Sequence, residues 1–291
     1  MTQRALEIVR PGVQTLVVDR GRFGHRSIGV AWCGAMDAPA LRRALAALRE
    51  SPGAAALEIA YGGFEVRFTD ATRVALAGAD CGAALDGASV PADGVFEAGA
   101  GSTLALQAPR RGSRTILAVK GGFDVPICLG SRATDAGAGF GGFGGRALRR
   151  GDRVPILAEG PDAPAELVEK PQIPGDGVAV RVVPTHEHDD FDAQSRRAFW
   201  ASEWKIAHES NRMGYRLEGP TLRFSATRPI RPHAVFPGVV QVPPGGAPIV
   251  LMSDAHTTGG YPKIGVVLAE DLWKIAQLRT GERVRFVEAR S

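Results

Sequence analysis

One stretch of sequence, Leu148-Arg149-Arg150-Gly151-Asp152-Arg153-Val154, recurs near the end of the chain as Leu278-Arg279-Thr280-Gly281-Glu282-Arg283-Val284. In both copies a glycine and an acidic residue stand just before an arginine and a valine. Glycine and acidic residues are typical of turns, so each copy predicts a turn that leads into a strand. Such a turn is common before the last strand of a barrel, and this match alone is weak evidence for a repeat.

A second pair of motifs supports the repeat. Leu57-Glu58 and Val66-Arg67-Phe68 in the first half are echoed by Leu217-Glu218 and Leu222-Arg223-Phe224 in the second. Both motif pairs occur in the same order in each half, although the first half carries extra residues around Cys81–Gly101. The shared order favours a duplicated domain.

The two halves are joined by a segment with the composition of a linker. Residues 159–177 hold several prolines and glycines among acidic and small residues, which is typical of interdomain linkers. We therefore expect an N-terminal domain at 1–158, a linker at 159–177 and a C-terminal domain at 178–291. A chain of 291 residues has room for two modest domains of this size.

Short apolar runs, separated by many of the 37 glycines and 20 prolines, predict a mainly β fold. Short strands with frequent turns favour barrels or sandwiches over a doubly wound sheet. The runs predicted as strands are Ala5–Val9, Gln14–Val18, Ala56–Ile59, Glu65–Phe68, Arg73–Ala77, Thr103–Gln107, Thr115–Val119, Val178–Val183, Ile249–Met252, Ile264–Leu268 and Arg283–Val287.

Three segments predict helices, so the fold class is α+β with β predominating. The first begins at Asp37-Ala38-Pro39, where a capping acid is followed by an early proline. The apolar residues that follow have the spacing of one buried helix face. The other two predicted helices are Phe191–Trp204 and Asp271–Leu278.

Composition and charge exclude several classes of protein. The net charge is only +4, and no basic stripe with interleaved aromatic residues exists, so we expect no nucleic-acid partner. No apolar run approaches membrane-spanning length, so we expect no membrane association. Three widely spaced cysteines and no apolar signal-peptide core in the first residues predict a cytoplasmic protein.

The stretch Ser253–Lys263 is the strongest candidate for a functional site. It follows the predicted strand Ile249–Met252 and combines hydroxyls, a carboxylate, an imidazole, a phenol and an ammonium around two glycines. Polar groups that converge at the end of a buried strand are typical of a small-molecule site. The alternative is an ordinary loop after a strand, and the segment alone favours neither.

Three other segments are weaker candidates. In an extended segment Arg212 and Arg216 would share one face, with Tyr215 on the other, so the two guanidinium groups could clamp an anion or pair with surface acids. Gln241 precedes a proline–glycine turn and could bind an amide. The glycine-rich loop at 137–146 lacks the helix of a dinucleotide site, but its backbone could cradle an anion with the help of Arg146 or Arg149.

The segment His186-Glu187-His188-Asp189-Asp190 resembles a metal cluster, because alternating histidines in a strand point the same way. It also lies between a predicted strand and a predicted helix, where Asp189 or Asp190 would cap the helix. We favour the cap and expect no metal site.

Taken together and in order, these segments make the chain similar to a known family. It resembles the family called the 5-oxoprolinase C subunit, allophanate hydrolase subunit 2 or Kip-antagonist, and is also similar to the carboxyltransferase domain of urea carboxylase. The motifs that carry this resemblance are Asp19–Gly24, Gly34–Asp37, Leu57-Glu58, Gly78–Asp80, Gly121-Gly122, Gly130–Arg132, the glycine loop to Asp152, Arg212–Leu217, Gln241–Pro244 and Thr257–Lys263.

The resemblance implies a pair of tandem cyclophilin-like β-barrels and an obligate partner, which is the B subunit or a protein of the allophanate hydrolase subunit 1 type. Together with an A subunit, such a pair opens 5-oxo-L-proline to L-glutamate with hydrolysis of ATP, with or without Mg²⁺. An alternative implied activity is a carboxyltransferase component that acts on urea or a related amide, with biotin supplied by another chain. A third is a non-catalytic, regulatory partner of a kinase-inhibitor protein.

The resemblance also suggests roles for individual residues. Family members often carry glutamines at the positions of Val18 and His256, so the substrate of this chain can differ. We predict catalytic roles for Lys263, Asp254 and Tyr261. The residues predicted to bind substrate are Arg212, Tyr215, Arg216, Gln241, His256, Thr257, Thr258, Gly259 and Gly260, and those predicted to bind ATP are Gly141, Gly142 and Arg146.

Overall fold

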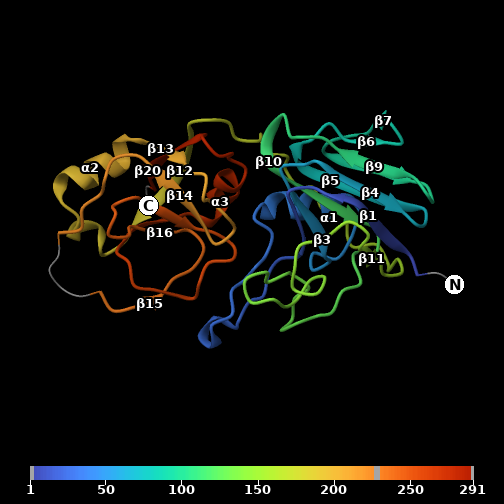
Figure 1. The fold of residues 1–291 in the computed structure, drawn as a ribbon, viewed down its shortest axis with the longest axis horizontal. Coiled ribbons are helices and arrows are strands. Elements are labelled where there is room, and N and C mark those ends of the chain that lie inside the picture. The colour runs from blue at the N-terminus through green and yellow to red at the C-terminus, as the bar shows by residue number, and fades with distance from the viewer. Residues whose placement is uncertain (1–2, 226–229, 290–291) are drawn as a thin grey trace. The chain divides into compact units, whose positions relative to one another are not determined.

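The chain divides into two compact units in the computed structural model, which describes residues 3–225 and 230–289 (Figure 1). The first unit comprises Met1–Phe23 and Cys33–Ile173, and the second comprises Gly24–Trp32 and Pro174–Ser291. The chain thus leaves the first unit within the segment predicted as a linker. The segment Gly24–Trp32, which the sequence placed in the first domain, belongs to the second unit, and no local pattern had indicated this.

The first unit contains two β-sheets. In the six-stranded sheet the order is β11 (Arg153–Pro155), β1 (Ala5–Pro11), β4 (Phe64–Phe68), β9 (Thr103–Leu106), β6 (Ala84–Leu85) and β7 (Ala88–Ser89). In the five-stranded sheet the order is β2 (Gln14–Val18), β3 (Ala56–Ala60), β10 (Arg111–Val119), β5 (Thr72–Asp80) and β8 (Gly94–Ala98).

The five-stranded sheet is buried on both faces, because consecutive strand residues point to opposite sides. In β10, Leu117 and Val119 join the core between the two sheets. Ile116 and Ala118 instead pack against α1 (Ala38–Ala47). This helix was predicted correctly, and its cap is Asp37, whose carboxylate accepts the Ala40 N–H at 2.8 Å.

The second unit is built on a closed barrel with two helices. Its strand order is β12 (Val178–Pro184), β19 (Lys263–Val267), β16 (Val239–Gln241), β17 (Ile249–Leu251), β14 (Gly214–Glu218), β13 (Glu203–Ile206) and β20 (Arg283–Glu288). The barrel closes because β12 also pairs in parallel with β20. The helices are α2 (Ala193–Ala201) and α3 (Ala269–Ala276).

A short two-stranded ribbon and two 3₁₀ turns complete the second unit. The ribbon pairs β15 (His233–Ala234) with β18 (Thr258–Gly259). The 3₁₀ turns are η1 (Arg26–Ile28) and η2 (His188–Asp190).

The N-terminal cap of α2 differs from the prediction. The predicted cap at Asp189 or Asp190 is wrong, because those residues belong to η2. Asp192 is the cap, since its carboxylate accepts the Ser195 N–H at 2.6 Å.

The prediction of a mainly β chain with few helices is confirmed, and a closed barrel is present in the second unit. The first unit differs from the expected barrel, because its described strands form two separate sheets. Part of the reason lies in the extra residues Cys81–Gly101. They form β6, β7 and β8, which extend the edges of both sheets instead of closing a single one.

The repeated stretch builds the same turn in both units. In each copy the glycine donates its N–H to an isoleucine carbonyl on a neighbouring strand, and the following acid accepts the N–H three residues earlier. In the first copy these bonds are Gly151–Ile8 (2.8 Å) and Arg149–Asp152 (2.7 Å). In the second copy they are Gly281–Ile206 (2.9 Å) and Arg279–Glu282 (2.8 Å).

The other repeated motif does not form the same structure in both units, since Val66–Phe68 lies in β4 whereas Leu222-Arg223 lies in no strand. The duplication stays a prediction.

No helix within residues 3–225 and 230–289 has the length and apolar character needed to cross a membrane.

A buried carboxylate on α3 ties this helix to the barrel. Asp271 is 2% exposed and accepts hydrogen bonds from the Arg181 backbone N–H and Nε, both at 2.8 Å. The Lys274 ammonium lies 2.7 Å away. Burial alone would raise the pKa of Asp271, but the bonds from Arg181 and Lys274 outweigh burial and hold the pKa at about 2.

We predict that Asp271→Asn lowers the free energy of unfolding by about 2 kcal/mol at neutral pH. The unfolded-state pKa is higher, so the loss should persist above pH 4 and disappear as the pH falls toward about 2. Urea unfolding of both proteins at several pH values measures this. Glu270→Gln, an exposed neighbour, is the control. A loss that does not change with pH would contradict the account.

Candidate functional site

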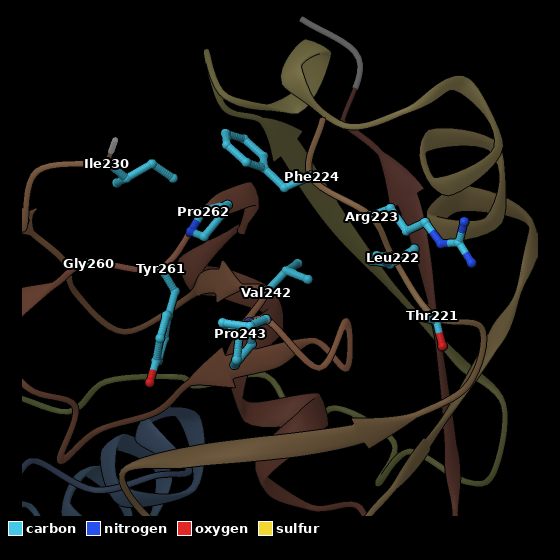
Figure 2. A pocket seen from close by; sticks show the side chains of 11 residues that line it. Thr221, Leu222, Arg223, Phe224, Ile230, Val242, Pro243, Gly260, Tyr261 and Pro262 are labelled. Atoms are coloured by element: carbon cyan, nitrogen blue, oxygen red, sulfur yellow. The ribbon is translucent and has the colours of Figure 1, made fainter. Parts of the chain in front are cut away.

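A cavity of about 640 Å³ lies in the second unit, beside the end of the Ser253–Lys263 stretch (Figure 2). Figure 2 shows Val242 and Pro243 between the side formed by Tyr261 and Pro262 and the side formed by Leu222. The Arg223 guanidinium points away from Tyr261 in this view. The lining is mostly apolar, and its members are Thr221, Leu222, Arg223, Phe224, Ile230, Val242, Pro243, Pro244, Gly260, Tyr261 and Pro262. Two of the predicted site residues, Gly260 and Tyr261, therefore reach this cavity.

Lys263 lies beneath the loop that forms one wall of the cavity. Its side chain is 4% exposed, and its Nζ donates to the carbonyls of Tyr261 at 2.9 Å and Gly259 at 3.2 Å. Within the part of the chain that the structure describes, no carboxylate comes within 4 Å of this ammonium. Burial lowers the pKa of Lys263, and the nearby negative charge of Glu187 opposes that shift.

Two side chains beside Lys263 were not predicted as site residues. Glu187 is buried, and its Oε2 accepts the Lys263 backbone N–H at 2.6 Å. His233 places Nδ1 at 3.4 Å from the Lys263 Nζ. Glu187 had been noted only as part of a resemblance to a metal cluster, and His233 stands in no recognisable motif. No group of His, Cys, Asp and Glu among residues 3–225 and 230–289 has the arrangement of a metal site.

Gln241 lies beside Lys263 on the neighbouring strand of the barrel, since the two residues are register partners. Its side chain is 7% exposed, and its Nε2 has no hydrogen-bond partner among the described residues. A Cβ at Gly259 would come within 2.3 Å of this nitrogen, so a side chain there would require Gln241 to move. A buried donor without a partner costs stability and indicates a place for a ligand or water oxygen.

Arg212, which we predicted to bind substrate, and Asp254, which we predicted to be catalytic, bind each other. The Arg212 Nε and Nη2 donate to the two carboxylate oxygens of Asp254 at 2.9 and 2.8 Å. The Asp254 backbone N–H also donates to the Arg212 carbonyl at 2.9 Å. Both side chains are largely buried. Arg212 thus binds a carboxylate through two parallel hydrogen bonds, as we predicted, but that carboxylate is the side chain of Asp254.

The other predicted substrate-binding residues are spread over the unit. Tyr215 is buried, and its hydroxyl donates to the Ala276 carbonyl of α3 at 3.3 Å, which gives it a packing role. Arg216 is exposed on the same strand. His256 is exposed, while Thr257 accepts the Val235 N–H at 3.0 Å through its carbonyl. Thr258 pairs in the ribbon as part of β18.

Arg26, in η1, binds the chain next to both strands of the β15–β18 ribbon. Its Nη2 donates to the carbonyl of Val235 and, at 2.9 Å, to the carbonyl of His256. Its guanidinium also lies 5.2 Å from the Trp32 ring centroid, a cation–π contact. One side chain from residue 26 thus fixes two segments far along the chain, which sequence patterns could not show.

The glycine loop of the first unit folds around a buried arginine. Arg22 is fully buried and donates to the carbonyls of Cys128 at 2.9 Å and Ala133 at 2.7 Å. A Cβ at Gly141 would come within 2.3 Å of the Ala133 carbonyl, and one at Gly142 within 1.9 Å of the Thr134 hydroxyl. The glycines are therefore needed for close packing against the chain itself.

Arg146, which we predicted to contact ATP, is also engaged within the loop region. Its Nη1 and Nη2 donate to the two oxygens of Asp152 at 2.7 and 2.9 Å. These bonds lower the pKa of Asp152, against the opposing effect of its burial. All of residues 137–146 are described, and the Arg146 guanidinium is paired with Asp152.

A second cavity, of about 850 Å³, lies against α1 in the first unit. Leu41 and Leu45 of α1 line it, and Ala163–Glu166 contribute to another side. None of the predicted site residues lines this cavity.

The chain is similar to several characterised proteins. The family described as carboxyltransferase domain, subdomain A and B, matches residues 28–288. The C subunit of 5-oxoprolinase from Escherichia coli (strain K12) is 43% identical over 283 residues, which are 97% of this chain and 91% of that protein. The Haemophilus influenzae protein of the same name is 37% identical, over 97% of this chain and 90% of that protein. The crystal structure of K. lactis urea amidolyase superposes with a TM-score of 0.91 at 28% identity, and covers 100% of this chain and 19% of that chain.

We predict that Asp254→Asn lowers the free energy of unfolding by about 3 kcal/mol, because it removes the negative charge that the buried Arg212 guanidinium contacts at two oxygens. Arg216→Ala, an exposed change on the adjoining strand, should shift it by less than about 0.5 kcal/mol. Urea unfolding monitored by tryptophan fluorescence measures both. Equal stabilities for Asp254→Asn and wild type would show that the pair does not hold this part of the fold.

Proposed function

Because the chain belongs to the family of 5-oxoprolinase C subunits, built on a carboxyltransferase domain with subdomains A and B, we propose that it is the C subunit of an ATP-dependent 5-oxoprolinase. It would help cleave 5-oxo-L-proline to L-glutamate together with a partner of the B-subunit type and an A subunit. We also propose that it works in the cytoplasm.

The observation that supports this activity most strongly is the match to the C subunit of the E. coli 5-oxoprolinase. The similarity extends over nearly all of both chains, at 97% and 91%. The match to urea amidolyase, by contrast, covers 19% of that protein. A C subunit is therefore the assignment that accounts for most of the chain and most of its relative.

The surroundings of Lys263 suit the cleavage of a cyclic amide. Opening a lactam places negative charge on the carbonyl oxygen and requires a proton on the leaving nitrogen. Lys263 is buried, has no carboxylate partner among the described residues, and has a pKa lowered by burial, so it can supply and recover a proton. The unpartnered Nε2 of Gln241 can donate to the amide oxygen. Tyr261, which lines the cavity, would contact the ring.

Two of the predicted roles change in this proposal. Asp254 and Arg212 neutralise each other, so we assign them to holding the loop that precedes the site, rather than to contact with substrate. Their buried pair fixes the start of the segment that carries Tyr261 and Lys263.

ATP would be consumed in the reaction, but the residues predicted to bind it do not fit its phosphates. The Arg146 fork is occupied by Asp152, and the neighbouring glycines pack against the chain. We therefore assign no step on this chain to ATP or Mg²⁺ and propose that the nucleotide binds elsewhere in the complex.

A carboxyltransferase acting on urea or a related amide is the second candidate. The TM-score of 0.91 to the K. lactis urea amidolyase, over the whole of this chain, favours it. Biotin and the remaining machinery would then come from other chains. Both reactions place charge on an amide oxygen, so the Lys263 surroundings serve either one.

We predict that Lys263→Met lowers kcat/KM for glutamate release about 100-fold or more, because the proton donor is lost while the apolar stem is kept. The assay uses the chain with its B-type and A-type partner proteins, 5-oxoproline and ATP. Lys205→Met, an exposed lysine, is the control and should stay within twofold of wild type.

A fall of less than tenfold in kcat/KM for Lys263→Met would contradict the catalytic role proposed for this lysine. ATP-dependent glutamate that disappears when the chain is omitted supports the C-subunit assignment. An intact complex that carboxylates urea, and releases no glutamate, favours the second candidate. A tight complex without turnover on either substrate would point to a regulatory partner.

We predict that Arg146→Ala lowers the free energy of unfolding by roughly 1 kcal/mol and leaves the KM for ATP within twofold of wild type. The reason is that the guanidinium of Arg146 pairs with the carboxylate of Asp152. Arg150→Ala, exposed in the same turn, is the control for general charge effects. A tenfold rise in the KM for ATP in a stably folded Arg146→Ala protein would restore the anion-binding role.

A further inference from the structure

The imidazole of His233 lies between a proton donor and a proton acceptor. Its Nδ1 is 3.4 Å from the Lys263 Nζ and 3.1 Å from the Arg231 carbonyl oxygen. Its Nε2 is 3.8 Å from the Oε1 of Glu187. The His233 side chain is 43% exposed, whereas Lys263 is nearly inaccessible. His233 is therefore a partly exposed side chain that contacts the buried ammonium.

The fold sets this geometry through the ribbon. His233 pairs with Gly259 across β15 and β18, and the carbonyl of Gly259 is itself an acceptor for the Lys263 Nζ. The same strand pair thus presents both a carbonyl and an imidazole to one ammonium. Arg26 holds the ribbon just beyond this point through its bonds to Val235 and His256.

Each protonation state of Nδ1 has a partner in place. Without a proton, Nδ1 can accept a hydrogen bond from the Lys263 ammonium. With a proton, the same atom can donate to the Arg231 carbonyl. An imidazole that serves only to fill space has no need of a donor and an acceptor at one nitrogen.

The charged groups around this pair include one that favours a proton on the imidazole. Glu187 is buried, and its carboxylate faces the Nε2 of His233, so it stabilises a positive charge on the imidazole. His186 is the other titratable neighbour, with its Nε2 3.7 Å from the Oε1 of Glu187 and its ring 6.5 Å from that of His233. His186 makes no contact with the ammonium.

We infer that His233 is the proton partner of Lys263 and carries protons between this buried lysine and solvent. In the transfer, an N–H bond of the Lys263 ammonium breaks and an N–H bond forms at the His233 Nδ1. The lysine becomes a neutral amine and the imidazole becomes an imidazolium, which then releases a proton to water. The reverse transfer reloads the lysine. No oxidant or other reactant is needed.

This inference rests on the proposed role of Lys263 in catalysis but not on the identity of the amide. His233 acts through the lysine and touches no substrate in this account, so it is a positioning residue. A purely structural histidine would affect stability and not the response of the rate to pH.

The first test uses the active complex and three versions of the chain. His233→Gln should lower kcat about tenfold and change the pH dependence of kcat. Added imidazole should restore part of the rate. His186→Gln, which changes the other histidine beside Glu187, should stay within twofold of wild type. An unchanged pH profile in His233→Gln, or a loss that imidazole does not restore, overturns the inference.

The second test needs no activity, so it separates this inference from the proposed function. The chain has only six histidines, and ¹⁵N NMR of the isolated protein reports which ring nitrogen carries the proton. At pH 8 the His233 Nδ1 should carry no proton in the wild-type protein, because it accepts a hydrogen bond from Lys263. It should become protonated in Lys263→Met, where the Arg231 carbonyl is its remaining partner. The same tautomer in both proteins would overturn the inference, even if the complex cleaves 5-oxoproline.

Discussion

The candidate site depends on one interaction, the burial of the Lys263 ammonium against the carbonyls of its own loop. The bonds to Tyr261 and Gly259 hold the loop over the lysine and leave the charge without a carboxylate among the described residues. Other features follow from this arrangement. The glycine at 259 leaves room for the Gln241 side chain, and the ribbon must stay paired for Gly259 to be in position. Arg26 secures that ribbon from a distant part of the sequence.

A second buried lysine shows how strongly the groups in contact with an ammonium determine its pKa. Lys120 in the first unit is 2% exposed, even less than Lys263. Its Nζ lies 2.9 Å from Glu50 and 2.9 Å from Asp162. Burial lowers the pKa of Lys120, but the two carboxylates outweigh burial and raise it overall. Lys263 has carbonyls and an imidazole in their place, so burial prevails. Of two lysines with little exposure, the one with two carboxylate partners thus has a raised pKa and the one without has a lowered pKa.

Local sequence was enough to predict much of the fold and only part of the site. The short apolar run located β2 at Gln14–Val18, and the Asp37 cap located α1, because these signals act within a few residues. The site depends on pairs far apart in sequence. Asp254 meets Arg212, and Arg22 fills the glycine loop that had suggested an anion site. His233 could not be predicted, because only the pairing of β15 with β18 brings it to Lys263.

The most direct test of this account is the titration of the lysine side chains by NMR in the isolated chain. There are only five lysines, Lys120, Lys170, Lys205, Lys263 and Lys274, and each Nζ can be assigned from a single substitution. The account predicts that Lys263 titrates below 10.5, the usual value for lysine, and that Lys120 titrates above it. A midpoint for Lys263 at or above 10.5 would contradict the claim that its ammonium is buried without a compensating negative charge.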